Sequence, residues 1–202
     1  MSPNAAPRVL ILASTSRYRA ALLERFGVPF SSCYPRVDEA EIAGEPPRER
    51  AVRLAAAKAE AVWAAVAGSQ PVLGADTAVV LDGEILGKPE TAAEAAAMLE
   101  RLSGRAHRVL TAVAVRHAGG LETRLSDSEV RFRATTAAER LAYCATEEPF
   151  DKAGGYGIQG YAAVFVEELK GSYSGVVGLP LFETAALLTR CGIPVWLTAQ
   201  AA

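Results

Sequence analysis

Two apolar patterns recur along the chain and predict its secondary structure. Short apolar runs rich in leucine and β-branched residues are typical of buried strands, and apolar positions repeated every three or four residues are typical of amphipathic helices. The predicted strands span residues 8–13, 30–34, 72–75, 77–81, 84–86, 108–117, 121–133, 161–169 and 193–197. The predicted helices span residues 17–26, 48–66, 91–102, 136–144 and 181–190.

The order of these elements predicts the fold class. Strands alternate with helices, and they also form hairpins, such as the one that Asp82-Gly83 indicates between two apolar runs. This combination predicts an α/β fold in which a mixed sheet is covered by helices on both faces. The chain has neither an internal repeat nor a linker rich in proline, glycine or serine. We therefore expect a single domain over residues 1–202.

The charge balance excludes some classes of partner. The 21 basic and 23 acidic side chains give a net charge of −2, whereas non-specific binders of nucleic-acid polymers or anionic membranes need a basic surplus. The apolar stretches fall well short of the roughly 20 residues that a membrane helix needs, and the first residues lack a signal-peptide pattern. We expect a cytoplasmic protein with no nucleic-acid polymer and no membrane as a partner.

The cysteines and histidines give no sign of a metal or disulfide framework. Cys33, Cys144 and Cys191 are an odd number without Cys-x-x-Cys spacing, which predicts buried thiols in a reducing compartment. His107 and His117 belong to a predicted hairpin and have no partners at useful spacing. We therefore expect neither histidine to be a ligand or a catalytic group.

The segment from Ser14 to Arg19 is the first with candidate chemistry. It leaves a predicted strand and enters a predicted helix, so backbone N–H groups and the positive end of the helix dipole point at one place. The hydroxyls of Ser14 and Ser16 and the guanidinium of Arg19 add donors that suit a phosphate group. The alternative is that one of the serines only caps the helix, which serine often does.

Carboxylates in two further segments could hold a divalent metal ion. One polar loop carries Asp38, Glu39, Glu41 and Glu45, and oxygen ligands of this kind suit Mg²⁺. Asp76 follows a predicted strand, at the edge where open α/β sheets collect ligands. The alternatives are a solvated acidic loop and an aspartate that bonds its own turn.

Lysines and glycines suggest a nucleotide as the ligand. The chain has 4 lysines against 17 arginines, and Lys58, Lys88 and Lys152 could converge as point charges on a triphosphate. Residues 154–160 include four glycines, which let the backbone approach a flat ligand. Gln159 in this segment can read a base edge through its paired donor and acceptor. Ordinary surface lysines and a flexible loop are the alternatives.

Taken together and in order, these segments resemble the Maf family of nucleoside triphosphate pyrophosphatases. The resemblance extends from Leu10 to Leu188, and its motifs are Leu12-Ala-Ser-Thr-Ser-x-x-Arg19, Val37-Asp-Glu39, Arg53-Leu-Ala-x-x-Lys58-Ala, Gly74-Ala-Asp-Thr77, Gly87-Lys-Pro89, Leu102-Ser-Gly-x-x-His107, Asp151-Lys-Ala-Gly-x-Tyr-Gly-Ile-Gln-Gly160 and Val177-Gly-Leu-Pro180. It implies an elongated mixed sheet flanked by helices, with two lobes and a central nucleotide cleft. It also implies hydrolysis of a nucleoside triphosphate to the monophosphate and diphosphate, with Mg²⁺ or Mn²⁺ as the cofactor.

The resemblance also implies roles for matching residues. Asp76 corresponds to the proton acceptor, and Glu39 and Asp76 would hold the metal ion. Thr77 and Gln159 match the specificity residues of the branch that is selective for dTTP and UTP. The residues that would line the phosphate path are Ser14, Ser16, Arg19, Lys58, Lys88 and Lys152.

Tyr18 departs from that branch, which usually has Pro-Arg-Arg where this chain has Arg17-Tyr18-Arg19. An aromatic residue here is typical of the branch that hydrolyses 7-methyl-GTP, because a ring can stack on a cationic base. Gln159 makes directional hydrogen bonds, whereas stacking tolerates many bases. We therefore expect dTTP, UTP and modified pyrimidine nucleotides as substrates, in a house-cleaning role, with 7-methyl-GTP as the alternative. A nucleotide-binding regulator of septum formation or cell division is a second alternative, and a homodimer stays open.

Overall fold

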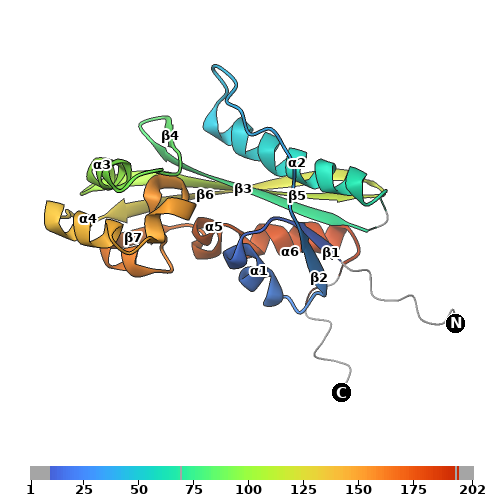
Figure 1. Cartoon of the computed structure of the whole chain (residues 1–202). Coiled ribbons are helices and arrows are strands. Elements are labelled where there is room, and N and C mark those ends of the chain that lie inside the picture. Colours follow the sequence, from blue (N-terminus) through green and yellow to red (C-terminus); the bar gives the residue numbers. More distant parts are fainter. Residues whose placement is uncertain (1–9, 69, 194, 196–202) are drawn as a thin grey trace, which may run out of the picture. The chain divides into compact units, whose positions relative to one another are not determined.

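A mixed β-sheet is the main feature of the computed structural model, which describes residues 10–68, 70–193 and 195 (Figure 1). Among these residues the strand order is β2-β1-β3-β5-β6-β7, with β4 paired to β3. β1 is parallel to β2 and β3, whereas the pairs β3–β4 and β6–β7 are antiparallel. The strands are β1 (Leu10–Ala13), β2 (Phe30–Cys33), β3 (Val72–Leu81), β4 (Glu84–Leu86), β5 (Ala106–His117), β6 (Gly120–Phe132) and β7 (Val166–Lys170).

Helices occupy most of the connections between the strands. They are α1 (Arg17–Glu24), α2 (Pro47–Ala65), α3 (Ala92–Leu102), α4 (Ala137–Cys144), α5 (Tyr173–Val177) and α6 (Leu181–Arg190). The predicted capping box at Thr136 is present, because its hydroxyl accepts from Glu139 N while the Glu139 carboxylate accepts from Thr136 N. The mixed sheet and its helices confirm the predicted α/β class. None of the helices among the described residues is long and apolar enough to cross a membrane.

The chain divides into two compact units. The first comprises residues 1–76, 112–125 and 178–202, and the second comprises residues 77–111 and 126–177. Strands β3, β5 and β6 each have residues in both units. Whether the whole chain acts as a single domain, as the sequence predicts, stays a prediction.

In the first unit, one face of α2 packs on strands through small side chains. Its buried residues include Ala51, Ala55 and Ala59, which join Ile11 of β1 and Val72 of β3 in one apolar cluster. In Figure 1, α2 lies on one face of these strands, and α1 and α6 lie on the other. Alanines keep the helix axis close to the strands, so a long side chain on the same helix face can reach the residues of a strand.

In the second unit, aromatic and leucine side chains form the core. Leu99 and Leu102 of α3 and Tyr143 of α4 join Phe132 and Phe165 in a buried cluster. Phe165 packs on Tyr143 with ring centroids 5.6 Å apart in an edge-to-face arrangement. This core supports the loop that contains the four glycines.

The structure corrects the prediction for strand β3. The sequence suggests two short strands separated at Asp76, but β3 runs from Val72 to Leu81 without a break, and Asp76 lies inside it rather than at its end. The physical reason is that Lys58 pairs with the Asp76 carboxylate. A buried aspartate with a charged partner does not have to end a strand.

Residues 161–165 are also not the strand that the sequence suggests. They form a 3₁₀ helix, and β7 begins only at Val166. The carboxylate of Glu148 accepts a hydrogen bond from Tyr161 N at 2.9 Å, which takes a backbone donor that a strand would use. The helix α5 has no counterpart among the predicted elements, and the predicted strand 193–197 falls largely outside the described residues. Of the three thiols, Cys33 is partly exposed rather than buried.

Candidate functional site

Lys58 joins two carboxylates within the first unit. Its ammonium nitrogen lies 2.7 Å from Asp76 Oδ1 and 2.8 Å from Glu39 Oε1. Lys58 and Asp76 are buried, whereas the side chain of Glu39 is 55% exposed. The two acidic residues that the sequence proposes as metal ligands therefore meet at one cation, and the Glu39 side of this group faces solvent.

The helix α2 and the strand β3 bring Lys58 and Asp76 together. Lys58 lies on the buried face of α2, one turn after Leu54 and Ala55. Gly74 of β3 lies so close to this face that a Cβ atom there would be 2.3 Å from the Ala55 carbonyl oxygen. Because only glycine permits this approach, Lys58 reaches the strand two residues further on, at Asp76.

Arg19 is a second cation near the same carboxylates. Its Nε donates to the Gly178 carbonyl at 2.9 Å, and its Nη1 donates to Ser14 Oγ at 3.4 Å. Burial lowers the pKa of the Arg19 guanidinium, while the charges of Asp76 and Glu39 act in the opposite direction. Arginine nevertheless stays protonated near neutral pH, so the group holds two cations and two carboxylates.

Both serines at the start of α1 take part in local hydrogen bonds. Ser16 is the N-cap, and its hydroxyl accepts from Arg19 N at 3.4 Å. The buried Ser14 accepts from Ser16 N at 3.1 Å. Ser16 therefore caps the helix, as the alternative interpretation of this segment proposes. The phosphate role of this segment stays a prediction. One cap satisfies only one of the backbone N–H groups at a helix N-terminus, so the others can still donate to a phosphate.

Within the described part of the chain, Glu39 is the residue of the acidic loop that forms an ion pair with Lys58. Glu45 instead receives two hydrogen bonds from Arg53, at 2.5 and 2.6 Å. Asp38 accepts from Ala40 N at 2.9 Å, within its own loop. The Arg53–Glu45 pair ties the loop to α2, and Arg53 therefore helps to position Glu39 although the sequence assigns it no role.

The donor chemistry of Glu39 and Asp76 fits a hard divalent cation. Mg²⁺ and Mn²⁺ prefer carboxylate oxygens and keep several waters, and here two carboxylates already converge on one positive charge. The described residues also contain one group of three mixed ligands, His117, Glu122 and Cys191, which does not include this pair.

In the second unit, Thr77 belongs to a directed chain of hydrogen bonds. Its hydroxyl oxygen lies 3.1 Å from Thr111 Oγ1, and Thr111 donates its own proton to the Gly175 carbonyl at 2.7 Å. Because Thr111 has a single hydroxyl proton, Thr77 must be the donor between the two threonines. The Thr77 hydroxyl can therefore offer a ligand only its acceptor lone pairs.

The side chains of Lys152 and Gln159 converge over Gly157. A Cβ atom on Gly157 would be 2.8 Å from Lys152 Cε and 2.9 Å from Gln159 Nε2. Lys152 also donates to the Glu148 carbonyl at 2.9 Å and pairs with Asp151. The structure thus brings Lys152 and Gln159, two of the predicted site residues, together, and their side chains fill the space that a side chain at residue 157 would occupy.

The same glycine-rich segment is attached to the strand hairpin that precedes Lys88. Gly154 N donates to the Gly87 carbonyl at 2.9 Å, which holds the segment beside the residue that precedes the exposed Lys88. Gly154 has a φ of 70°, and a Cβ atom there would be 2.8 Å from Val79 Cγ1. Close packing and a left-handed backbone both require glycine here.

A buried histidine anchors the middle of this segment. His107 Nε2 lies 2.7 Å from the Tyr156 hydroxyl, and both rings pack edge to face with Phe132. Burial lowers the pKa of His107 to about 4 and raises the pKa of Tyr156, so both groups are neutral at pH 7. Contrary to the sequence-based expectation that His107 lacks a partner, it supports residues 152–160.

Tyr18 is engaged by its neighbour Arg17. The Arg17 Nη2 donates to the Tyr18 hydroxyl at 2.9 Å, and the guanidinium carbon lies 4.9 Å from the ring centroid. One face of the ring is therefore already covered by a cation, which reduces its capacity to stack on a cationic base.

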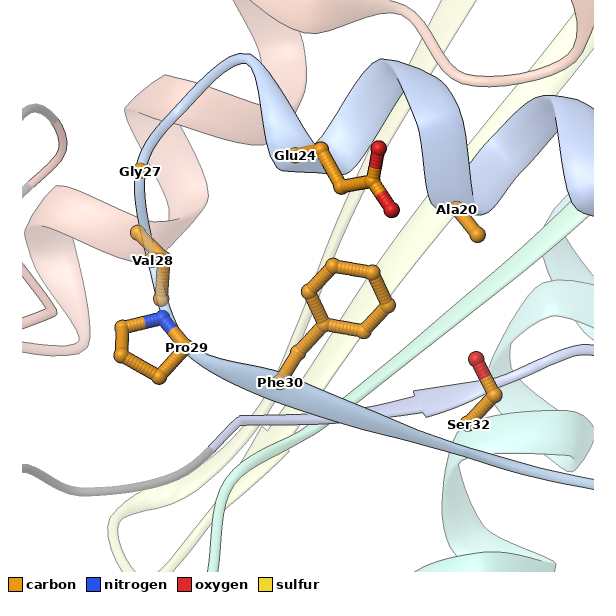
Figure 2. A pocket seen from close by; sticks show the side chains of 7 residues that line it. All are labelled: Ala20, Glu24, Gly27, Val28, Pro29, Phe30 and Ser32. Carbon is orange, nitrogen blue, oxygen red and sulfur yellow. The ribbon is translucent and has the colours of Figure 1, made fainter.

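A concave pocket of about 490 Å³ lies elsewhere in the first unit (Figure 2). Its walls come from the end of α1, the following turn and β2, with Phe30 and Glu24 turned toward it. None of the predicted site residues lines it. The lining side chains carry one carboxylate and no basic group, so the pocket is unsuited to a triphosphate.

Comparison with known proteins identifies the family. The model of Maf-like proteins matches residues 9–191. The chain belongs to the Maf family, as the resemblance predicts. A protein from Aromatoleum aromaticum named dTTP/UTP pyrophosphatase is 49% identical over 200 residues, which cover 92% of this chain and 97% of that protein. Another of that name, from Shewanella sp. (strain MR-7), is 52% identical over 191 residues, covering 91% and 98%.

Among solved structures, the Ham1 protein of Staphylococcus aureus is similar at a lower level. It is 17% identical with a TM-score of 0.41, and the match covers 61% of this chain and 71% of that chain.

Sequence reasoning assigns no role to several residues that position the site. Gly74 and Arg53 place Lys58 and Glu39, and Glu148 holds the end of the glycine-rich segment through Tyr161 N. Gly74 and Arg53 belong to the family motifs, which marks them as important but does not indicate what they do. Glu148 stands in none of them, and its role depends on a contact 13 residues away.

Proposed function

We propose that this chain hydrolyses dTTP and UTP to the nucleoside monophosphate and diphosphate. The observation that carries the proposal is the meeting of Glu39 and Asp76 at Lys58, beside Arg19. Carboxylates that can hold a divalent cation, together with fixed positive charges, are the elements that phosphoryl-type transfer needs. Relatives about 50% identical over most of the chain are named dTTP/UTP pyrophosphatases.

In the proposed reaction a water molecule attacks the α-phosphorus, and the bond from this phosphorus to the α–β bridging oxygen breaks. Asp76 accepts a proton from the attacking water, and diphosphate leaves with the bridging oxygen. Lys58 donates to Asp76 Oδ1 and so fixes the orientation of the carboxylate that takes the proton. Arg19 stabilises negative charge that develops on the phosphate oxygens.

Glu39 and Asp76 would hold Mg²⁺ or Mn²⁺, and when bound the ion supplies Lewis-acid activation of water and neutralises phosphate charge. Ser14, Ser16 and the N-terminus of α1 would contribute uncharged donors to phosphate oxygens. Lys88 and Lys152 would add point charges to the phosphates. Each of these assignments is tested by the loss of turnover when the side chain is removed.

The preference for pyrimidines is supported by the hydrogen-bonding capacity of Thr77 and Gln159. Uracil and thymine present a donor at N3 between two carbonyl acceptors, and Thr77 can offer only an acceptor. The amide of Gln159 can donate to a carbonyl and accept at the same time. Arg17 covers one face of the Tyr18 ring, so 7-methyl-GTP, the alternative substrate, could stack only on the other face. The proposal also includes a cytoplasmic location and a homodimer.

Replacement of Asp76 by asparagine tests the mechanism. We expect Asp76→Asn to fold normally and to lose several orders of magnitude in kcat, because the amide cannot accept the proton. The measurement is release of diphosphate from UTP in the presence of Mg²⁺ or Mn²⁺. Asp82→Asn is the matched control, because Asp82 is an exposed turn residue whose positive φ of 53° suits asparagine.

A panel of dTTP, UTP, CTP, GTP and 7-methyl-GTP tests the substrate. We expect diphosphate rather than orthophosphate as the product, with dTTP and UTP cleaved best. Near-wild-type turnover by Asp76→Asn would remove that residue from the mechanism. Binding of UTP without release of diphosphate would instead identify a nucleotide-binding regulator.

A further inference from the structure

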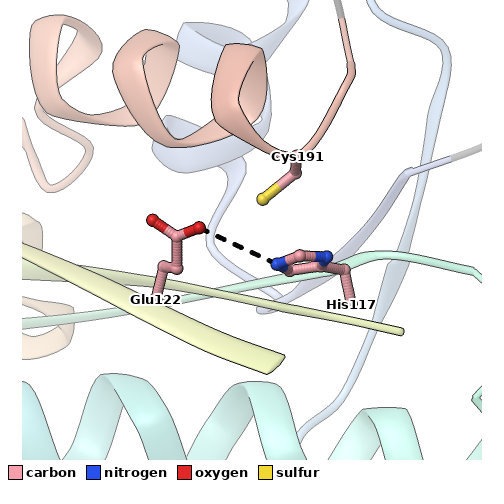
Figure 3. Close-up of side chains that lie close together, drawn as sticks. All are labelled: His117, Glu122 and Cys191. Atoms are coloured by element: carbon pink, nitrogen blue, oxygen red, sulfur yellow. Dashed lines mark ion pairs between the residues drawn. The ribbon is translucent and has the colours of Figure 1, made fainter. Parts of the chain in front are cut away.

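Three side chains of different chemistry converge in the first unit, apart from the carboxylates that Lys58 joins (Figure 3). They are His117 at the end of β5, Glu122 near the start of β6 and Cys191 at the C-terminal end of α6. One ligand atom from each lies within 4.8 Å of the other two. Neither the proposed hydrolysis nor the positioning of its residues uses any of the three.

We propose that His117, Glu122 and Cys191 bind a transition-metal cation of the Zn²⁺ or Co²⁺ type, as a site separate from that of the metal used in hydrolysis. One nitrogen, one oxygen and one sulfur ligand are the mixture that Zn²⁺ accepts, whereas Mg²⁺ and Ca²⁺ select oxygen alone. The thiol therefore gives the site a selectivity that Glu39 and Asp76 lack.

The separations are compatible with tetrahedral coordination after small side-chain rotations. His117 Nε2 lies 3.9 Å from Glu122 Oε1. Ligands at about 2.0–2.3 Å from a tetrahedral ion lie about 3.3–3.8 Å from one another. The longest separation therefore has to contract by about 1–1.5 Å, which side chains at the ends of three elements can provide without a change in the fold.

The surroundings orient Glu122 and balance the charge. Arg190 Nε lies 2.8 Å from Glu122 Oε2, which leaves Oε1 as the oxygen nearer to His117. A thiolate and a carboxylate together neutralise a divalent ion, so Arg190 can keep its pair with Glu122 as an outer contact. Cys191 also stands at the C-terminal end of α6, where the helix dipole favours a cation.

The turn between β5 and β6 lets the His117 ring fold back toward this group. A Cβ atom on Gly119 would be 2.9 Å from His117 Cε1, so a larger residue there would displace the ring from its present position. Gly119 N donates to His117 Nδ1 at 3.3 Å. Ligation through Nε2 would move the ring proton to Nδ1 and break this exposed contact, which water can replace.

A bound ion would have three protein ligands and a remaining position for water. Cys191 is buried, whereas the side chains of His117 and Glu122 are 21% and 28% exposed, so the ion can exchange with solvent on their side. The ion would connect the end of α6 to the β5–β6 hairpin and would stabilise the first unit by binding only its folded form.

Titration of the full-length protein with Co²⁺ tests the proposal. Thiolate ligation gives a sulfur-to-cobalt charge-transfer band in the near ultraviolet, which a site made of carboxylates does not. We expect one equivalent of Co²⁺ to produce this band and Zn²⁺ to abolish it by displacement. Addition of Zn²⁺ alone should raise the melting temperature.

Variants of two cysteines supply the matched comparison. Cys191→Ser should lose the band and the Zn²⁺-dependent rise in melting temperature, whereas Cys33→Ser, which also removes one thiol, should retain both. Glu122→Gln and His117→Gln keep the thiol, and we expect each to weaken Co²⁺ binding at least about ten-fold. These two variants keep the test decisive if Cys191→Ser fails to fold, which circular dichroism without metal would show.

A wild-type protein without the charge-transfer band would overturn the proposal. So would a band that survives in Cys191→Ser, or Co²⁺ affinity that is unchanged in both Glu122→Gln and His117→Gln. Because none of these readouts depends on turnover, failure here leaves the proposed hydrolysis untouched.

Discussion

Gly74 of β3 and Ala55 of α2 approach so closely that a Cβ atom on Gly74 would lie 2.3 Å from the Ala55 carbonyl oxygen and 2.8 Å from Ala59 N. The obstacle is helix backbone, which cannot rotate away as a side chain can. This approach sets the distance between α2 and β3, and with it the contact of Lys58 with Asp76. The absence of a side chain at Gly74 thus determines where Lys58 and Asp76 meet.

The first prediction follows from this contact. We expect Gly74→Ala to push α2 away from β3, to lower the free energy of unfolding by about 1–3 kcal/mol and to reduce kcat with UTP more than it changes KM. Urea denaturation and initial rates are the measurements. Gly87→Ala is the stability control, because a Cβ atom there would meet nothing within 4 Å. An unchanged melting temperature in Gly74→Ala would contradict the argument.

The second prediction concerns the ion pair itself. Lys58→Met leaves the buried Asp76 carboxylate without its ion-pair partner, although Arg19 stays nearby, and we expect a loss of about 3–5 kcal/mol in the free energy of unfolding. Lys170→Met should cost at most about 1 kcal/mol, because the Lys170 side chain is 62% exposed. Urea denaturation of both variants at neutral pH measures the difference.

A double-mutant cycle separates the pair from its surroundings. Asp76→Asn should remove part of the penalty of Lys58→Met, because the buried charge that lacked a partner is then gone. The expected coupling free energy is about 1–3 kcal/mol. Strict additivity of the two single variants would mean that the pair contributes nothing to stability.

Much of the fold is predictable from local signals, and the exceptions have identifiable causes. The helix of Lys58 follows from its apolar spacing, and the hairpin follows from Asp82-Gly83, whose φ angles of 53° and 83° are both positive. Asp76 looks like a strand end because its partner is 18 residues away in sequence. The same limit applies to residues 161–165, whose backbone donor is taken by Glu148.

The candidate site is predictable in its residue types but not in its arrangement. The local patterns mark Glu39, Asp76 and Lys58 in three separate segments, and the family resemblance implies that they share a site. The contact of Lys58 with both carboxylates depends on the packing of α2 on β3, which no local pattern encodes. The surroundings of His117 are hidden from the sequence for the same reason, because Cys191 belongs to an element more than 70 residues later in the chain. Periodicity encodes which face of an element is buried, and it does not encode which buried faces meet.

The third prediction is a pH dependence caused by His107. Burial lowers its pKa from 6.5 in the unfolded chain to about 4 in the folded protein. Between these values the unfolded chain binds a proton that the folded protein does not. Stability therefore falls as the pH decreases from 6.5 toward 4, by up to about 3 kcal/mol from this residue.

The measurement is urea denaturation at several pH values from 7.5 to about 4. We expect the wild type to lose more stability over this window than His107→Gln, which cannot take up the proton. Tyr156→Phe should lower stability by a similar amount at every pH, because it removes a hydrogen bond but keeps His107 buried. Parallel pH profiles of wild type and His107→Gln would show that His107 is not the source.

The last prediction tests how Thr77 distinguishes pyrimidines. Thr111 donates to the Gly175 carbonyl, so the Thr77 proton is committed to Thr111 and only an acceptor remains for a base. N3 of uracil carries a proton, whereas N3 of cytosine is an acceptor and would face another acceptor. Thr77→Val, which is nearly isosteric but lacks the hydroxyl, should therefore lower the preference for UTP over CTP in kcat/KM by about 2- to 10-fold.

Two further variants distinguish this hydrogen-bonding account from a steric one. Thr77→Ser keeps the hydroxyl and loses only a methyl group, so we expect it to keep the preference. Thr111→Val leaves Thr77 intact but frees its proton, so Thr77 can then also donate, and the discrimination against CTP should weaken. If Thr111→Val retains the wild-type ratio while its melting temperature shows a folded protein, the direction of the hydrogen bonds does not set the specificity.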